Sequence, residues 1–299
     1  MTERVPRAPR LRGGSGTSVG VAAAMVVALP VLLGVAYTVL GALGLVGVGA
    51  SQVAGLQSTP LERIVAERDV LLSTAWTLWI AAASTTLATV GASAVALLYR
   101  GNRGWDRLAR ATALLPLAVP HLAAAVGGLL ILGQSGLLAR FAYAGGWLAS
   151  PAEMPALVLD RAGVGLIISL AWKELPFLAL VAVSVLATRG AALEGTARGL
   201  GAGPLATLAR VTWPLLWRGL LPAIVAVFAF VVGSYEAAIL LGPSDPMALP
   251  VLTWERLNQA ALARRGEAYA LSLIATGIAL AAVAVHEVLA ARGRRGEGS

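Results

Sequence analysis

The stretch Glu194-GTARGLGAGPLATLARVTWPLL-Trp217 separates two long apolar runs of this sequence, near residues 163–187 and 219–242. It combines a glycine-rich segment with a short apolar pattern and Pro214, whereas a plain solvated loop needs no such order and is less apolar. Four of its residues recur at helical spacing: Leu205, Leu208, Val211 and Thr212. We predict a short amphipathic helix over 204–213, lying along a membrane surface, that Pro214 ends. An exposed apolar face there implies a protein partner or the bilayer surface.

The composition indicates a protein surrounded by lipid. Apolar residues make up 58% and charged residues 13% of the chain, against roughly 45–50% and 25% in soluble domains. Cysteine is absent, which excludes disulfides, thiolate nucleophiles and thiolate metal sites. The formal charge of +8 is carried almost wholly by arginine, since Lys173 is the only lysine. These arginines lie in short stretches between apolar runs, a pattern that favours a membrane protein over a nucleic-acid-binding one.

Six apolar stretches are each long enough to cross ~30 Å of hydrocarbon. They lie near residues 19–49, 70–98, 111–135, 163–187, 219–242 and 267–291. The first is uncharged and too long for the core of a cleaved signal peptide, so we expect a retained anchor. The sequence therefore predicts an all-α polytopic protein with one six-helix domain, 19–291. A disordered N-terminal tail, 1–18, and a short C-terminal tail, 292–299, flank this domain.

Arginine is unevenly divided between the two sides of the predicted bundle. Most arginines lie in the N-terminal tail, the second-to-third connection, the fourth-to-fifth connection and the C-terminal tail. All four segments fall on one side if both termini lie there, and the other side receives fewer arginines together with most of the acidic loop residues. Cytoplasmic connections carry the excess of basic residues. We therefore expect a multi-pass protein of the bacterial inner membrane with both termini in the cytoplasm.

The fourth-to-fifth connection resembles the EAA loop of binding-protein-dependent ABC importer permeases of the type I fold. That pattern is Glu-Ala-Ala, three residues, glycine, nine residues, an aliphatic residue, one residue and Leu-Pro. With the glycine placed on Gly201, Val211 takes the aliphatic position, Trp213 replaces the leucine and Pro214 is the final proline. The triplet becomes Gly195-Thr196-Ala197 and Glu194 lies one residue early, so the acidic residue is either displaced or supplied by its neighbour.

The resemblance covers residues from about 70 to 291. The segment FVVGSYEAAILLG, 230–242, is similar to the fifth span of the polyamine, thiamine and iron subgroup of these permeases. By resemblance, the loop within 188–218 is the coupling helix that docks on an ATPase subunit. The residues assigned to it are Glu194, Gly195, Thr196, Ala197, Gly201, Ala202, Pro204, Val211 and Pro214.

The resemblance also implies partners and a division of labour. It implies an ABC ATPase dimer, a second permease subunit that is the same or a sister chain, and an extracytoplasmic solute-binding protein. The chain itself has no GxxxxGK[ST] phosphate-binding loop, because its one lysine follows Trp172 inside a predicted span. We therefore expect a non-catalytic transport subunit that binds no cofactor, with ATP and Mg used by the partner ATPase and no contact with nucleic acid.

Charged residues lie inside two of the predicted spans. Lys173 and Glu174 fall near the middle of the fourth, and Tyr235 and Glu236 fall in the fifth. A charge at mid-bilayer costs at least ~2.5–3.5 kcal/mol, so these side chains are expected to face the bundle interior or water. Two interpretations stand. Lys173 and Glu236 form an ion pair that stabilises the bundle, or the four residues line the substrate path.

Prolines mark possible bends, and other functions receive less support. Pro116 and Pro120 in the third span can each bend a helix.

An intramembrane serine protease would need Ser135 and His286 within roughly 3 Å, but the predicted topology puts them ~30 Å apart in depth. His121 and His286 have no carboxylate at metal-ligand spacing, so no metal site is expected. An ion-gradient-driven transporter remains the alternative function.

Overall fold

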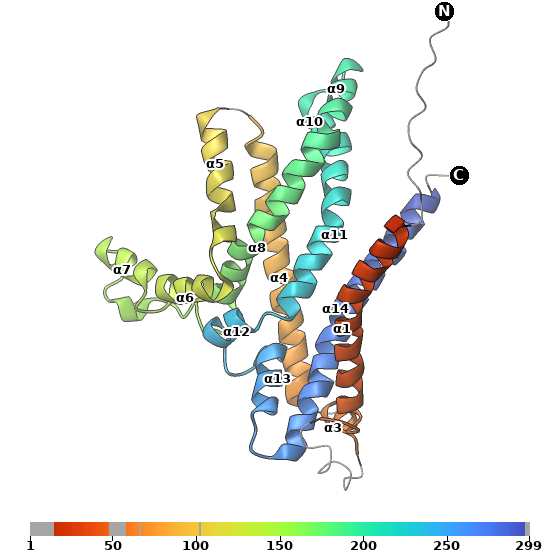
Figure 1. Ribbon diagram of the computed structural model, residues 1–299. Helices are drawn as coiled ribbons and strands as arrows, with labels where there is room; N and C mark the ends of the chain where they lie inside the picture. The colour runs from red at the N-terminus through yellow and green to blue at the C-terminus, as the bar shows by residue number, and fades with distance from the viewer. Residues whose placement is uncertain (1–14, 48–57, 66, 102, 297–299) are drawn as a thin grey trace, which may run out of the picture.

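The computed structural model describes residues 15–47, 58–65, 67–101 and 103–296. Within these ranges all regular elements are helical, as Figure 1 shows. Six helical stretches are long and apolar enough to cross a membrane. They are Gly20–Ala42, Arg68–Leu98, His121–Ala144, Val164–Gly199, Pro204–Val232 and Arg264–Arg292. The predicted all-α, six-span fold is thereby confirmed, although the ends of several spans differ from the expectation.

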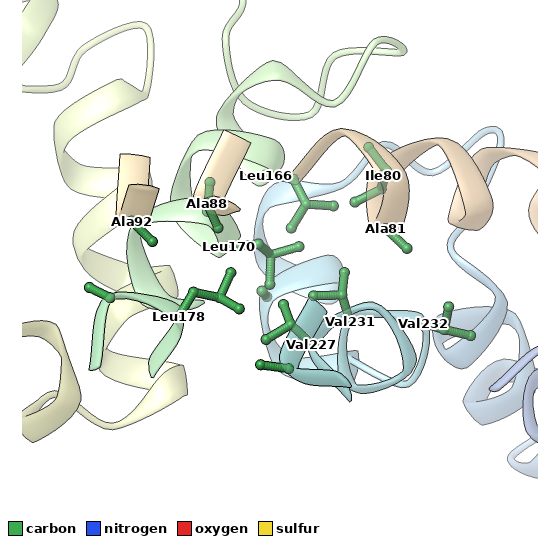
Figure 2. Close-up of a cluster of buried hydrophobic side chains, with 14 of the residues drawn as sticks. Ile80, Ala81, Ala88, Ala92, Leu166, Leu170, Leu178, Val227, Val231 and Val232 are labelled. Carbon is green, nitrogen blue, oxygen red and sulfur yellow. The ribbon is translucent and has the colours of Figure 1, made fainter. Parts of the chain in front are cut away.

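Three helices form the centre of the bundle: α4 (Arg68–Leu98), α8 (Val164–Val185) and α11 (Trp213–Val232). Several alanines of α4, among them Ala88 and Ala92, lie against larger aliphatic residues of the other two helices such as Leu178 and Val227, and Ile80 joins this cluster from α4 (Figure 2). Gly91 lies so near α8 that a Cβ there would come 2.6 Å from a methyl group of Leu175. Small residues thus allow the close backbone approach on which helix association in lipid depends.

A second group of helices packs beside this centre. Helix α14 (Leu262–Gly296) contacts both α11 and α1 (Ser15–Ala42). At one end of the bundle, α3 (Pro60–Val65) and α13 (Leu249–Leu257) share a second buried cluster with α14. The start of α1 and the end of α14 lie toward the other end, where α9 and α10 project (Figure 1).

The first span is shorter than predicted at its end and longer at its start. Helix α1 begins at Ser15, inside the segment 1–18 that was expected to be disordered, because the helical apolar run continues backward through small residues. Residues 1–14 lie outside the described part of the chain. The helix ends at Ala42, not near residue 49, because Gly44 and Gly47 take left-handed φ values of 74° and 94°.

The third span is broken at the two prolines that were predicted as possible bends, and the helical stretch long enough to cross a membrane runs over His121–Ala144 instead of 111–135. Helix α5 (Gly104–Leu114) passes into a 3₁₀ turn at Leu115–Ala118, and α6 (His121–Leu132) then sets off in a different direction (Figure 1). Proline provides the reason, because Pro120 has no N–H with which to continue an α-helix. A further helix, α7 (Leu137–Ala144), and a 3₁₀ turn at Pro151–Glu153 follow.

The fifth span also ends earlier than predicted. Helix α11 stops at Val232, and after Gly233 and Ser234 a separate short helix, α12 (Tyr235–Leu241), begins. The expected single span over 219–242 is therefore two elements. Ser234 takes an extended backbone conformation before α12, which a hydropathy pattern does not reveal.

Candidate functional site

The predicted coupling loop is a helical hairpin. Helix α8 continues through a π-helical turn at Leu186–Gly190 into α9 (Ala191–Gly199), and the returning arm runs through α10 (Pro204–Thr207) and a π-helical turn at Leu208–Thr212 into α11. The arm Val164–Gly199 has 36 residues, or about 54 Å at 1.5 Å per residue, against ~30 Å of hydrocarbon. The hairpin tip therefore projects beyond the bundle (Figure 1).

Gly201 closes the first arm with a specific hydrogen-bond pattern. Its φ is +87°, its N–H donates to the carbonyl of Arg198 at 2.9 Å, and the N–H of Ala202 donates to the carbonyl of Ala197 at 3.0 Å. These two bonds are those of a Schellman motif, in which the residue after the helix is left-handed and is usually glycine. The left-handed backbone at Gly201 thus explains why a glycine stands at this position of the family pattern in this chain.

Pro214 does not end a helix, so that part of the prediction is wrong. It lies in the first turn of α11, within one helical stretch from Pro204 to Val232. The π-helical turn at Leu208–Thr212 directly precedes it and relaxes the hydrogen-bond ladder at the point where the proline lacks a donor. The segment 204–213 is consequently the outer part of the returning arm, continuous with α11, and not a separate helix.

The tip of the hairpin is apolar and open. Leu200 is 85% exposed and Leu205 is 81% exposed. Gly195, Thr196, Gly201 and Pro204 are exposed as well, and Ala197, Ala202, Val211 and Pro214 are half-buried. A Cβ added at Gly201 would meet no atom within 4 Å, so a large side chain there has room within the chain. Exposed apolar residues in a projecting turn are typical of a contact surface.

Glu194 behaves differently from the other residues of the predicted loop, because it is buried, with 6% of its surface exposed. Its Oε1 accepts hydrogen bonds from Arg100 Nη1 at 2.7 Å and Thr212 Oγ1 at 2.6 Å. Its Oε2 accepts from the same Arg100 nitrogen at 3.0 Å and from Arg198 Nη2 at 3.4 Å. The carboxylate is therefore satisfied inside the chain. No sequence pattern indicated Arg100 as its partner, because the two residues lie 94 positions apart.

Lys173 does not pair with Glu236, so the predicted intramembrane ion pair is wrong. The Lys173 side chain is buried, and its Nζ donates to the carbonyl oxygen of Pro116 at 3.0 Å. Glu236 is exposed on the first turn of α12 and has no hydrogen bond or ion pair within the described residues. Glu174 lies 3.4 Å from His121 Nε2.

Aromatic side chains surround these charged groups. The His121 ring lies 5.1 Å from the ring of Phe230 on α11, measured between centroids. The Tyr235 ring lies 5.8 Å from that of Trp254, which joins α12 to α13. The structure thus separates the four predicted residues into a lysine bound to backbone, a Glu174–His121 pair, and a helix turn that holds a half-buried Tyr235 and an exposed Glu236. Their place on a substrate path stays a prediction.

A buried ionic cluster lies at the end of the bundle opposite the hairpin, and the sequence analysis did not predict it. Arg256 of α13 is 5% exposed and donates to Glu67 Oε2 at 2.6 Å and Glu267 Oε2 at 2.7 Å. Arg63 Nη1 lies 3.4 Å from the other oxygen of Glu267. From the sequence these residues read as ordinary charges at span ends, because their partners come from α3, α4, α13 and α14.

The described residues contain no group of three or more His, Asp or Glu side chains placed to hold a metal ion. Ser135 lies in the turn between α6 and α7, where its carbonyl accepts a bond from Arg140 Nε at 3.0 Å.

Comparisons with known proteins give a consistent result. No protein-family model matches the chain. It is 33% identical over 184 residues to the inner membrane ABC transporter permease protein YnjC of Escherichia coli, covering 59% of this chain and 33% of that protein. It is 28% identical over 219 residues to a probable molybdenum ABC transporter permease protein of Haloferax volcanii, covering 72% and 74%. The molybdenum transport system permease protein ModB of Mycobacterium bovis is 32% identical over 160 residues, covering 53% and 57%.

The chain thus spans a third of the length of the Escherichia coli relative and just over half of ModB. Among solved structures, a chain of a bacterial alginate ABC transporter in complex with its alginate-bound periplasmic protein matches with a TM-score of 0.70. That match has 15% identity and covers 93% of both chains. A second alginate ABC importer structure matches with a TM-score of 0.62 and 18% identity, covering 78% of this chain and 82% of the other. These likenesses establish the fold.

Proposed function

We propose that the chain forms the solute path of an ATP-driven importer. Its similarity to permease proteins of ABC transporters and the fold it shares with ABC importer structures support the proposal. The chain then works with a separate ATPase dimer, a second permease subunit and an extracytoplasmic solute-binding protein. It carries no catalysis itself, and ATP and Mg are used by the ATPase. The alternative of an ion-gradient-driven transporter is not favoured, since the named relatives are ABC permeases.

The hairpin of α9 and α10 is the observation that carries this proposal. Its two arms continue directly into α8 and α11, which belong to the bundle centre. A force applied at the tip therefore acts on the core helices without an intervening flexible loop. The exposed Leu200 and Leu205 offer an apolar contact for a partner. On this proposal the hairpin end faces the cytoplasm, together with both termini, as the arginine distribution indicates.

Mechanistically, the proposal needs only two states of a rigid hairpin. ATP binding draws the two ATPase subunits together, each hairpin follows its subunit, and the attached α8 and α11 tilt. Access to the path between the two permease subunits then changes from one side of the membrane to the other. The solute is left open, and molybdate is the first one to test, since two of the relatives are named for molybdenum.

A pull-down tests the proposal directly. The tagged chain is expressed in its own host, cross-linked, solubilised gently and analysed by mass spectrometry beside Gly201→Trp. A Cβ at Gly201 would meet no atom within 4 Å, but the φ of +87° strains any residue other than glycine. The variant must therefore be recovered in folded, membrane-inserted form before loss of the partner is taken as blocked docking. Gly104→Trp is the matched control, since Gly104 is also open and starts α5 at the hairpin end.

A P-loop ATPase recovered with the wild type and Gly104→Trp, and lost with Gly201→Trp, supports the proposal. Absence of any ATPase from the wild type after cross-linking contradicts it. Recovery of equal ATPase with Gly201→Trp leaves the importer assignment standing and removes the hairpin as its docking point.

A further inference from the structure

The Glu194 carboxylate joins three separate parts of the chain. Glu194 lies on α9, Thr212 lies on the returning arm at the base of α11, and Arg100 follows the end of α4. The two arms of the hairpin are thus bonded to each other and to the third core helix through one buried group. The Arg100–Glu194 distance of 2.7 Å, with a second bond at 3.0 Å, is that of a charge-assisted hydrogen bond.

Hydrogen bonds from α5 fix the backbone around Arg100, the residue that binds Glu194 at the end of α4. Arg110 of α5 donates through Nη1 to the carbonyl of Tyr99 at 2.7 Å and to that of Gly101 at 3.0 Å. These two residues flank Arg100 on either side. The arginine that binds Glu194 is therefore not on a free loop, because α5 fixes the backbone on which it sits.

The direction of the Glu194 side chain also matters. Glu194 is buried, and its carboxylate accepts four hydrogen bonds, from Arg100, Arg198 and Thr212. A partner approaching the tip meets the exposed Leu200 and Leu205 instead. The acidic residue of the motif, shifted by one position in this sequence, is thus turned toward its own bundle.

We infer that Arg100 is a positioning residue that clamps the hairpin to the end of α4, so that the hairpin, α4, α8 and α11 move as one body. The inference rests on the proposed function, since it says how a push on the tip reaches the third core helix. Without the Arg100–Glu194 interaction, the hairpin tip keeps its apolar contact surface. It is then connected to α4 only through the packing of α4 against α8 and α11. Partner binding then survives while the transmitted movement is reduced.

The absence of cysteine makes the test direct, because labels can be placed without removing native thiols. Val90 on α4 and Ala192 on α9 are exposed and lie away from the tip. Spin labels on Val90→Cys and Ala192→Cys report the distance between α4 and the hairpin in the full complex, without nucleotide and with AMP-PNP. The pair is measured in the wild-type background and with Arg100→Met, Arg100→Lys, Glu194→Gln and Arg103→Met.

The clamp predicts one narrow distance in the wild type that does not shift on addition of AMP-PNP. Arg100→Met and Glu194→Gln are expected to broaden the distribution and to introduce a nucleotide-dependent shift. Arg100→Lys, which keeps the charge but loses the guanidinium geometry, is expected to restore most of the narrow distribution. Arg103→Met removes the same charge three residues away from an exposed position and is expected to match the wild type.

A wild-type distance that itself shifts with AMP-PNP, or an Arg100→Met distribution identical to the wild type, overturns the clamp. Should Arg100→Met fail to insert, Glu194→Gln alone decides, because it keeps the side-chain volume and loses only the charge. The nucleotide-free measurement is repeated on the purified permease chain without the ATPase, so the clamp can fail while the pull-down succeeds. Conversely, the pull-down can fail while the nucleotide-free distances still show the clamp.

Discussion

The ammonium group of Lys173 on α8 lies 3.0 Å from the carbonyl oxygen of Pro116, at the break between α5 and α6. In a continuous α-helix this carbonyl would accept the N–H of residue 120, which is a proline and has none. The N–H of Val119 supplies one 3₁₀-type bond at 3.2 Å, and the lysine supplies the other. The buried lysine thus completes the hydrogen bonding of a broken span.

Replacing Lys173 with methionine is expected to destabilise the protein, because the Pro116 carbonyl loses a charged donor in a buried place. Hydrogen bonds to charged groups contribute roughly 1.5–3 kcal/mol, and we expect a loss near the lower value because the buried ammonium group also disappears. The melting temperature of the purified protein in detergent measures this. Glu236→Gln is the matched control and is expected to leave the melting temperature unchanged, since Glu236 is exposed and has no side-chain partner in the described chain.

A double-mutant cycle separates this account from the ion pair that the sequence suggested. If Lys173 and Glu236 interacted, each single variant would destabilise and the double variant would cost less than their sum. Additive effects are expected instead. A coupling free energy above about 0.5 kcal/mol between the two positions would contradict the Lys173–Pro116 assignment.

The Schellman turn makes a graded prediction at Gly201. A left-handed conformation costs most residues about 1–2 kcal/mol, and asparagine tolerates it better than alanine, which in turn tolerates it better than a β-branched residue. Transport activity and ATPase recovery are therefore expected to fall in the order Gly201→Asn, Gly201→Ala, Gly201→Val, although a Cβ at this position meets no atom within 4 Å. Equal activity of the asparagine and valine variants would show that the φ of +87° is not needed.

The six-span architecture could be predicted because hydropathy and arginine placement are properties of whole segments. The bend at Pro116–Pro120 could be anticipated from its prolines, whereas the break at Gly233-Ser234 could not, since the apolar character continues across it while the backbone turns. The hairpin glycine was identified from the family pattern, and its geometry gives that pattern a cause. The prediction that Pro214 ends a helix was wrong because a proline is tolerated in the first turn of a helix, here directly after a π-helical turn.

The bonding partners of the charged residues could not be predicted from the sequence. Lys173 bonds a backbone carbonyl, which no pattern of side chains announces. Arg100 and Glu194 are 94 positions apart, and Arg256 and Glu67 are 189 apart. Such pairs depend on how the helices pack, and the span order alone leaves that packing open.

The buried ionic cluster around Arg256 predicts a large difference between two arginines. Arg256→Met leaves the carboxylates of Glu67 and Glu267 without their main donor, and breaking a buried pair in this way costs about 3–5 kcal/mol. Arg161→Met removes an ion pair to Asp245 that is 3.4 Å long and mostly exposed, for which roughly 0–1 kcal/mol is expected. The fall in melting temperature of each variant relative to the wild type measures the two losses of stability. A fall for Arg161→Met as large as that for Arg256→Met would mean that burial does not set the strength of these pairs.

Helix α1 offers a test of close packing with an internal control. A Cβ at Gly41 would lie 2.6 Å from the Tyr269 ring on α14, whereas a Cβ at Gly34 would meet no atom within 4 Å. Gly34→Ala is expected to stabilise α1 by about 0.5–1 kcal/mol through the backbone alone. Gly41→Ala receives the same gain but must displace the aromatic ring, and overpacking of this kind costs about 1–3 kcal/mol. The melting temperature is therefore expected to rise slightly for Gly34→Ala and to fall for Gly41→Ala, and a rise for both would mean that α1 does not rest on Tyr269.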